Sequence, residues 1–136
     1  MTDFLNLVYA EQCPAAIVTL KNGALASQGS FQGMYQISYP INGKPSWTLE
    51  PYAIWYSLEY GWLIGFLDNI GGDVCAFYAI DDYEGLDDAN NQWYYWDGSN
   101  WILAGANDVN ITCTSNNISL AEHRLQKIEL RSTKLN

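Results

Sequence analysis

The chain has little positive charge. It contains 6 Lys and Arg residues against 15 Asp and Glu, which gives a formal net charge of −9. No Lys or Arg lies between Lys44 and Arg124, although the same interval holds 12 acidic residues. Such a surface repels phosphate groups, so we expect no binding to nucleic acids or to anionic lipid surfaces. Cationic, neutral and metal partners are compatible with it.

Long hydrophobic runs are also lacking. No stretch approaches the roughly 18 apolar residues of a membrane-spanning helix, so we expect no membrane insertion. The N-terminal segment 1–12 has no basic start and only a short apolar stretch, which is not the pattern of a signal peptide. The chain is therefore either cytoplasmic or a module whose targeting segment lies elsewhere, and we favour the second, extracellular setting.

No catalytic constellation is visible. The only histidine, His123, lies near the C-terminus, outside the aromatic region, and no glycine-rich phosphate-binding motif is present. A small hydrolase would require one carboxylate with a raised pKa and a second at a defined separation. The acidic residues lie mostly in hydrophilic loops, which argues against such a pair, so we expect a protein that is not an enzyme.

Cysteine is scarce, with Cys13, Cys75 and Cys113 only. They have no CxxC spacing and no neighbouring histidine, which argues against a zinc site. Cys13 and Cys113 bracket the aromatic region, and a disulfide between them would join the first strand of the domain to the last. Three reduced, buried cysteines are the alternative.

Aromatic residues are abundant and concentrated: 18 of the 20 lie between Phe31 and Trp101. Short apolar segments alternate with turn signals at a spacing of about ten residues, which predicts an all-β antiparallel sandwich or barrel of eight or nine short strands. We expect Ile54, Trp55, Trp62, Ile64 and Phe77 in its core. The predicted strands are 15–20, 32–39, 44–49, 53–58, 61–67, 74–80, 93–96, 101–103 and 108–113, with a loop over 25–29.

The tail differs in pattern from the β-domain. Ser119 and Glu122 fit a capping box, and the apolar spacing that follows predicts a short amphipathic C-terminal helix over 119–131. The predicted organisation is an N-terminal extension (1–12), an aromatic-rich β-domain (13–113) and a linker with a C-terminal helix (114–136).

An acidic, turn-rich loop spans 81–92. Its carboxylates are hard oxygen ligands of the kind that Ca²⁺ prefers, although their order does not match an EF-hand. We expect no obligatory cofactor, with calcium as the one possible ligand. The alternative is a solvated loop that prevents edge-to-edge aggregation. The candidate calcium ligands are Asp81, Asp82, Glu84, Asp87 and Asp88.

The hairpin from Trp93 to Trp101 is the strongest candidate for a binding site. Successive strand residues face opposite sides of a sheet, so Trp93 and Tyr95 share one face while Tyr94 and Trp96 share the other. At least one aromatic face should therefore contact solvent. The candidate ligand-binding residues are Tyr94, Trp96, Asp97, Asn100 and Trp101.

Several short motifs occur in a fixed order along 13–113. They are Gly33-x-Tyr35, Asn42-Gly43-Lys44-Pro45-x-Trp47, Ile54-Trp55-Tyr56, Trp62-x-Ile64-Gly65, Trp93-x-Tyr95-Trp96-x-Gly98 and Val109-x-Ile111-x-Cys113. In this order they resemble a small cysteine-bracketed β-module of extracellular, often multi-module proteins of invertebrates and protists. The resemblance implies an extracellular setting and a non-catalytic role. Two features depart from it: the missing signal-peptide pattern and Cys75, which would have no partner.

Two kinds of partner fit the aromatic hairpin. Flat rings beside Asp, Asn and Gln side chains are typical of carbohydrate binding, so we expect a recognition module with a carbohydrate ligand. Tyr and Trp also dominate protein interfaces, so a structural or adhesive protein-interaction module is the alternative. The sequence predicts no particular oligomeric state.

Overall fold

The computed structural model describes residues 13–79, 86 and 92–114. The predicted N-terminal extension, the C-terminal helix 119–131 and the five candidate calcium ligands lie outside them.

The described residues form nine antiparallel strands in one sheet, with the order β8-β7-β6-β5-β4-β3-β2-β1-β9. The predicted antiparallel all-β architecture is confirmed, and every predicted strand matches an observed one to within a few residues. The strands are β1 (Ala15–Leu20), β2 (Gly33–Ile37), β3 (Trp47–Leu49), β4 (Tyr52–Ser57), β5 (Gly61–Phe66), β6 (Phe77–Ala79), β7 (Tyr94–Trp96), β8 (Trp101–Leu103) and β9 (Val109–Cys113).

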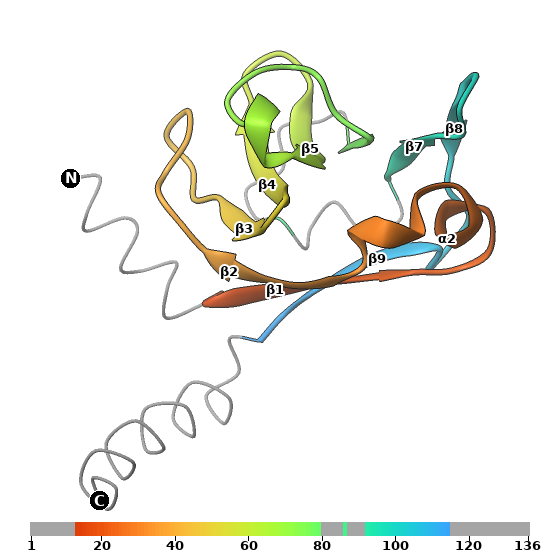
Figure 1. Cartoon of the computed structure of the whole chain (residues 1–136), viewed down its shortest axis with the longest axis horizontal. Coiled ribbons are helices and arrows are strands. Elements are labelled where there is room, and N and C mark those ends of the chain that lie inside the picture. Colours follow the sequence, from red (N-terminus) through yellow and green to blue (C-terminus); the bar gives the residue numbers. More distant parts are fainter. Residues whose placement is uncertain (1–12, 80–85, 87–91, 115–136) are drawn as a thin grey trace, which may run out of the picture.

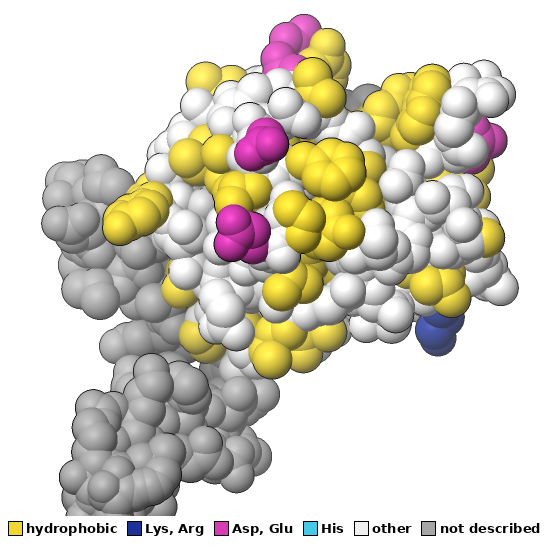
Figure 2. Space-filling model, viewed as in Figure 1, with side chains coloured by type: hydrophobic (Ala, Val, Ile, Leu, Met, Phe, Trp, Pro, Cys, Tyr) yellow, Lys and Arg dark blue, Asp and Glu magenta, His cyan; other side chains and the backbone are white. Residues whose placement is uncertain are grey.

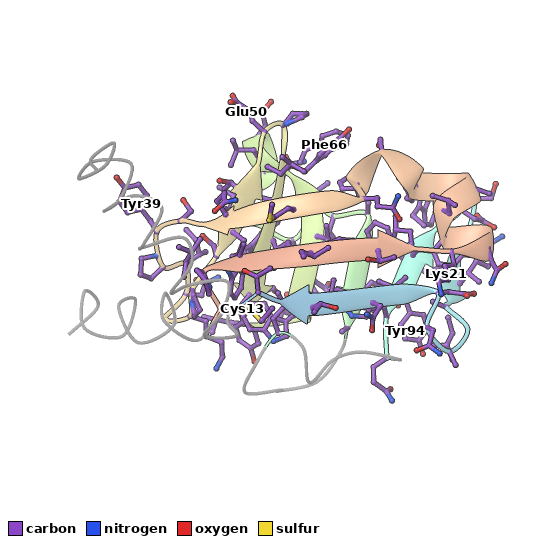
Figure 3. The ribbon with its side chains drawn as sticks, turned by 90° about the horizontal axis from the view of Figure 1, so that it is seen from below. Cys13, Lys21, Tyr39, Glu50, Phe66 and Tyr94 are labelled. Atoms are coloured by element: carbon purple, nitrogen blue, oxygen red, sulfur yellow. A yellow bond between two sulfur atoms is a disulfide. The ribbon has the colours of Figure 1, made fainter. Side chains whose placement is uncertain are left out.

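The sheet curls into a half-barrel (Figure 1). Strands β1 to β8 follow one another as a meander, and β9 then returns to pair with β1, as Figure 3 shows for the adjacent ribbons of β1 and β9. Strands β8 and β9 are consequently the two ends of the strand order. The core lies on the concave, inner side, and the outer side of β6, β7 and β8 faces away from it.

A short helix lies where the sequence predicted a loop. Residues Asn22–Gln28 form α2, and Gly29–Phe31 continue it as a 3-10 helix. The prediction of a loop over 25–29 was wrong. No side chain caps the N-terminus of this helix, so the sequence lacks the usual signal for a helix start. The first residue of the helix, Asn22, has a positive φ of 53°, which is typical of a turn. Helix α2 packs against β7 on the inner side of the sheet, where the Gln28 side-chain amide donates a hydrogen bond to the Trp96 carbonyl oxygen at 2.8 Å.

Aromatic side chains fill the inner core. Trp47 and Trp62 lie with ring centroids 5.9 Å apart, and the Trp47 indole N–H donates to the Cys13 carbonyl oxygen at 2.9 Å. The five predicted core residues are all buried. Four of them lie in this inner core, and the fifth, Trp55, does not.

Trp55 belongs to a second, smaller cluster on the outer side of β4 and β5. Adjacent strand residues face opposite sides, so Ile54 enters the inner core and Trp55 points outward with Ala53 and Leu63. The segment from Leu67 to Cys75 covers this outer cluster, and the Trp55 indole N–H donates to the Gly72 carbonyl oxygen at 3.0 Å. The two central strands are therefore buried on both faces.

A disulfide joins Cys13 to Cys113, as the bracketing of the aromatic region predicted. Their Cα atoms are 4.9 Å apart, and the bond closes a loop with a sequence separation of 100 residues. Cys113 lies opposite Ala16 in the β1–β9 ladder, so the bond ties the first strand to the last. Cys75 is a free, partly exposed cysteine.

Among the described helices, none has the length and apolar character to span a membrane.

Candidate functional site

The β7–β8 hairpin has one buried and one partly exposed aromatic face. Trp93 and Tyr95 point inward, at 0% and 8% exposure, whereas Tyr94 and Trp96 are only half-buried on the outer side. This division is the one that strand alternation predicted. On β8, Trp101 points outward with 39% of its surface exposed, so the hairpin presents three large rings to the outside.

The pairing register brings these rings together with a fourth. Tyr78 on β6 lies opposite Tyr94, and their rings stack with centroids 4.9 Å apart and planes inclined by 8°. Trp96 lies opposite Trp101, with centroids 5.3 Å apart. We call this set, Tyr78, Tyr94, Trp96 and Trp101, the outer aromatic face.

Trp101 connects the two halves of this face. It lies on β8 and Tyr78 lies on β6, so β7 separates their backbones by two strand spacings, about 9.6 Å. Their ring centroids are nevertheless only 4.7 Å apart, with planes inclined by 72°. Both side chains must therefore lean over β7, which makes the four rings one contiguous surface.

The turn at the end of this face is held by Asp97. Its carboxylate oxygen Oδ1 accepts hydrogen bonds from the backbone N–H groups of Ser99 and Asn100, both at 2.7 Å. These bonds, first that from Asn100 and then that from Ser99, lower the pKa of Asp97. The structure thus places Asp97 and Asn100 beside Trp96 and Trp101, at the tip of the hairpin, where Asp97 fixes the turn as well as supplying a charge.

A pocket of about 230 Å³ adjoins the outer aromatic face. Its lining residues come from four elements and were not predicted as a group from the sequence. Tyr78 and Trp101 belong to the outer aromatic face, Tyr60 comes from the turn between β4 and β5, and Cys75 comes from the segment that precedes β6.

Ser57 holds two walls of this pocket together. Its buried hydroxyl donates to Asp73 Oδ1 at 2.8 Å and accepts from the backbone N–H groups of Glu59 and Tyr60, at 3.1 and 3.0 Å. One side chain thus joins the turn that carries Tyr60 to the segment that carries Asp73 and Cys75.

The pocket is negatively polarised. The pKa of Tyr60 is raised, chiefly by the nearby charge of Glu59 and also by Asp73. The pKa of Cys75 is raised from 9.0 to about 12, mainly because burial disfavours the thiolate and secondly because Asp73 lies close. At neutral pH Cys75 is therefore a thiol, which makes it a poor nucleophile.

No cluster of three or more His, Cys, Asp or Glu side chains that could hold a metal ion occurs within residues 13–79, 86 and 92–114. Because the five candidate calcium ligands lie outside that part of the chain, this finding does not bear on them.

No family model, curated protein or solved structure matches this chain.

Tyr60, Cys75 and Tyr78 were missed because they are distant from the hairpin in sequence. Tyr78 did carry a signal, since it lies between two inward-facing positions in 77–79 and must point outward. The ring that Tyr78 stacks on, however, depends on the register between β6 and β7. The sequence of the acidic loop between these strands does not predict that register.

Proposed function

We propose that this protein is a non-catalytic, extracellular recognition module that binds carbohydrate through its outer aromatic face. The observation that carries the proposal is the contiguity of Tyr78, Tyr94, Trp96 and Trp101 on one side of three adjacent strands. Buried aromatic residues need no explanation beyond the core. Rings left partly in water on a rigid sheet are suited to contact with a ligand.

The chemistry of a sugar ring fits this surface. One side of many pyranose rings presents C–H groups that pack on an aromatic plane, while the hydroxyls at the rim require hydrogen-bonding partners. Trp101 offers an accessible indole, and Asp97 and Asn100 offer polar atoms at the adjoining turn.

The extracellular setting is supported by the Cys13–Cys113 disulfide, because such bonds persist mainly in oxidising compartments. The negative charge of the chain is consistent with a neutral ligand.

A glycan array tests the carbohydrate proposal. The wild-type protein should bind a defined set of glycans, and Trp96→Ala should lose them. Gln28 donates its hydrogen bond to the backbone carbonyl of Trp96, and this change retains that acceptor. Phe66→Ala is the matched control: Phe66 is an exposed aromatic at 49%, but it contacts Phe31 and Tyr52 instead of the outer aromatic face.

The second candidate is a protein-interaction module, which the edge position of β8 favours. This strand is the last in the sheet order and carries the exposed side chains of Trp101 and Leu103. An edge strand can accept a further strand from another chain. An array without glycan signal, together with self-association that Trp96→Ala abolishes, would reject carbohydrate binding in favour of this role.

A further inference from the structure

The pocket beside the outer aromatic face has a composition of its own. Among the described residues, four line it: three are aromatic (Tyr60, Tyr78 and Trp101), and the fourth is the neutral thiol of Cys75. The rings of Tyr78 and Trp101 meet at 72°, so they form two walls of a corner. The volume of about 230 Å³ is below the roughly 300–1,000 Å³ of pockets that take drug-sized ligands, and it suits one small chemical group.

Two carboxylates that do not line the pocket place negative charge close to it. Glu59 is adjacent to Tyr60, and it raises the pKa of that hydroxyl by its charge and by a hydrogen bond. Asp73 acts on both Tyr60 and Cys75 and is held in place by the Ser57 hydroxyl. The positions of Glu59 and Asp73 thus give the pocket walls a negative electrostatic potential.

No positive charge of the described chain offsets these carboxylates at the lining. Lys21 and Lys44 are the two basic residues within the described part, and neither lines the pocket. The Lys44 amine instead lies 5.1 Å from the centre of the Tyr56 ring. Figure 2 shows one face of the molecule, on which acidic side chains lie beside hydrophobic ones.

The aromatic walls and the negative charges of Glu59 and Asp73 together favour a cation. The faces of Trp and Tyr rings attract positive charge, and several rings around one pocket are how proteins recognise quaternary ammonium groups. A primary ammonium is strongly hydrated and would lose much of that hydration against ring carbons, whereas methyl groups both reduce hydration and pack on the rings. An anion would be repelled by Glu59 and Asp73.

We propose that the pocket formed by Tyr60, Cys75, Tyr78 and Trp101 binds a trimethylammonium group. The pocket is a separate site from the proposed carbohydrate surface, although both include Tyr78 and Trp101. Free choline and free trimethyllysine are two sources of the same group, and each is to be measured separately.

A titration followed by nuclear magnetic resonance tests the proposal on the full chain. Choline should shift the signals of the pocket residues, and 3,3-dimethylbutan-1-ol, the neutral isostere of choline, should bind at least about fivefold more weakly because it lacks the charge. Ethanolamine should also bind more weakly than choline. If choline and the neutral isostere bind equally, or if choline shifts no pocket signal, the proposal is wrong.

Two pairs of variants connect the binding to these residues. Tyr60→Ala should weaken choline at least about fivefold, whereas Tyr60→Phe, which keeps the ring, should stay within about twofold of wild type. Asp73→Asn retains an acceptor for Ser57 and removes the charge, so it should weaken choline without altering the neutral isostere. Equal choline affinity in wild type, Tyr60→Ala and Asp73→Asn would overturn the assignment. Tyr60 lies outside the outer aromatic face, so Tyr60→Ala should retain glycan binding on the array, and a failure of this site can be distinguished from a failure of the carbohydrate site.

Discussion

Removal of the Ser57 hydroxyl should destabilise the protein and disorganise the pocket together. Ser57 is 2% exposed, and its hydroxyl makes three hydrogen bonds, one of them to the carboxylate of Asp73. A neutral hydrogen bond contributes about 0.5–1.5 kcal/mol net, and one to a charged group about 1.5–3 kcal/mol. Since water can reach the partly buried partners after the change, we expect Ser57→Ala to cost about 2–4 kcal/mol, less than the simple sum.

Ser46 provides a matched control. It is the other buried polar residue of the described chain, at 1% exposure, and its hydroxyl donates one hydrogen bond, to the Tyr39 carbonyl oxygen. Ser46→Ala should therefore cost only about 1 kcal/mol. Urea unfolding of wild type and both variants measures the difference, and choline titration of the folded variants should show weaker binding for Ser57→Ala alone. A loss for Ser57→Ala no greater than that for Ser46→Ala would refute the role given to the Ser57 hydroxyl.

Three further predictions follow from the disulfide, from a close backbone contact and from the buried thiol. Reduction of Cys13–Cys113 should lower the free energy of unfolding by about 4–5 kcal/mol, because it frees a loop of about 100 residues; a urea midpoint unchanged by dithiothreitol would contradict this. Gly65→Ala should lower the free energy of unfolding in urea by about 1–3 kcal/mol, because a Cβ at this position would lie 3.0 Å from the Cα of Cys75. Gly29→Ala is the control and should be tolerated, because its Cβ would meet only the flexible side chain of a leucine. Equal losses of stability in the two variants would count against the close contact at Gly65. Because burial raises the pKa of Cys75 to about 12, its rate of reaction with iodoacetamide should still be rising as the pH passes 9 and 10. A rate that levels off near pH 9 would show that burial does not raise the pKa.

The strands could be predicted because each half-buried strand repeats its apolar side with a period of two residues, a local property. Ala15–Leu20 and Trp101–Leu103 were predicted to the residue. Helix α2 could not be predicted, because a seven-residue helix that starts at Asn-Gly carries the local signature of a turn, and it is its packing against β7 that supports it.

The candidate site likewise contains residues that the sequence predicted and residues that it did not. Alternation predicted that Tyr94 and Trp96 would share an outer face, and the structure places them there. The contribution of Tyr78 depends on the register of β6 with β7, and those of Tyr60 and Cys75 depend on the hydrogen bonds of Ser57. The strand register and the Ser57–Asp73 hydrogen bond join residues that are distant in sequence, and local patterns do not specify such contacts.

The most direct test of the outer aromatic face as a binding surface uses the six tryptophan indole N–H signals. Four tryptophans (Trp47, Trp55, Trp62 and Trp93) are buried at 1% exposure or less, and only Trp96 and Trp101 lie on the outer aromatic face. Titration with a glycan selected on the array should shift the indole signals of Trp96 and Trp101 and leave the other four in place. Unchanged signals for Trp96 and Trp101 while the glycan binds would contradict the account.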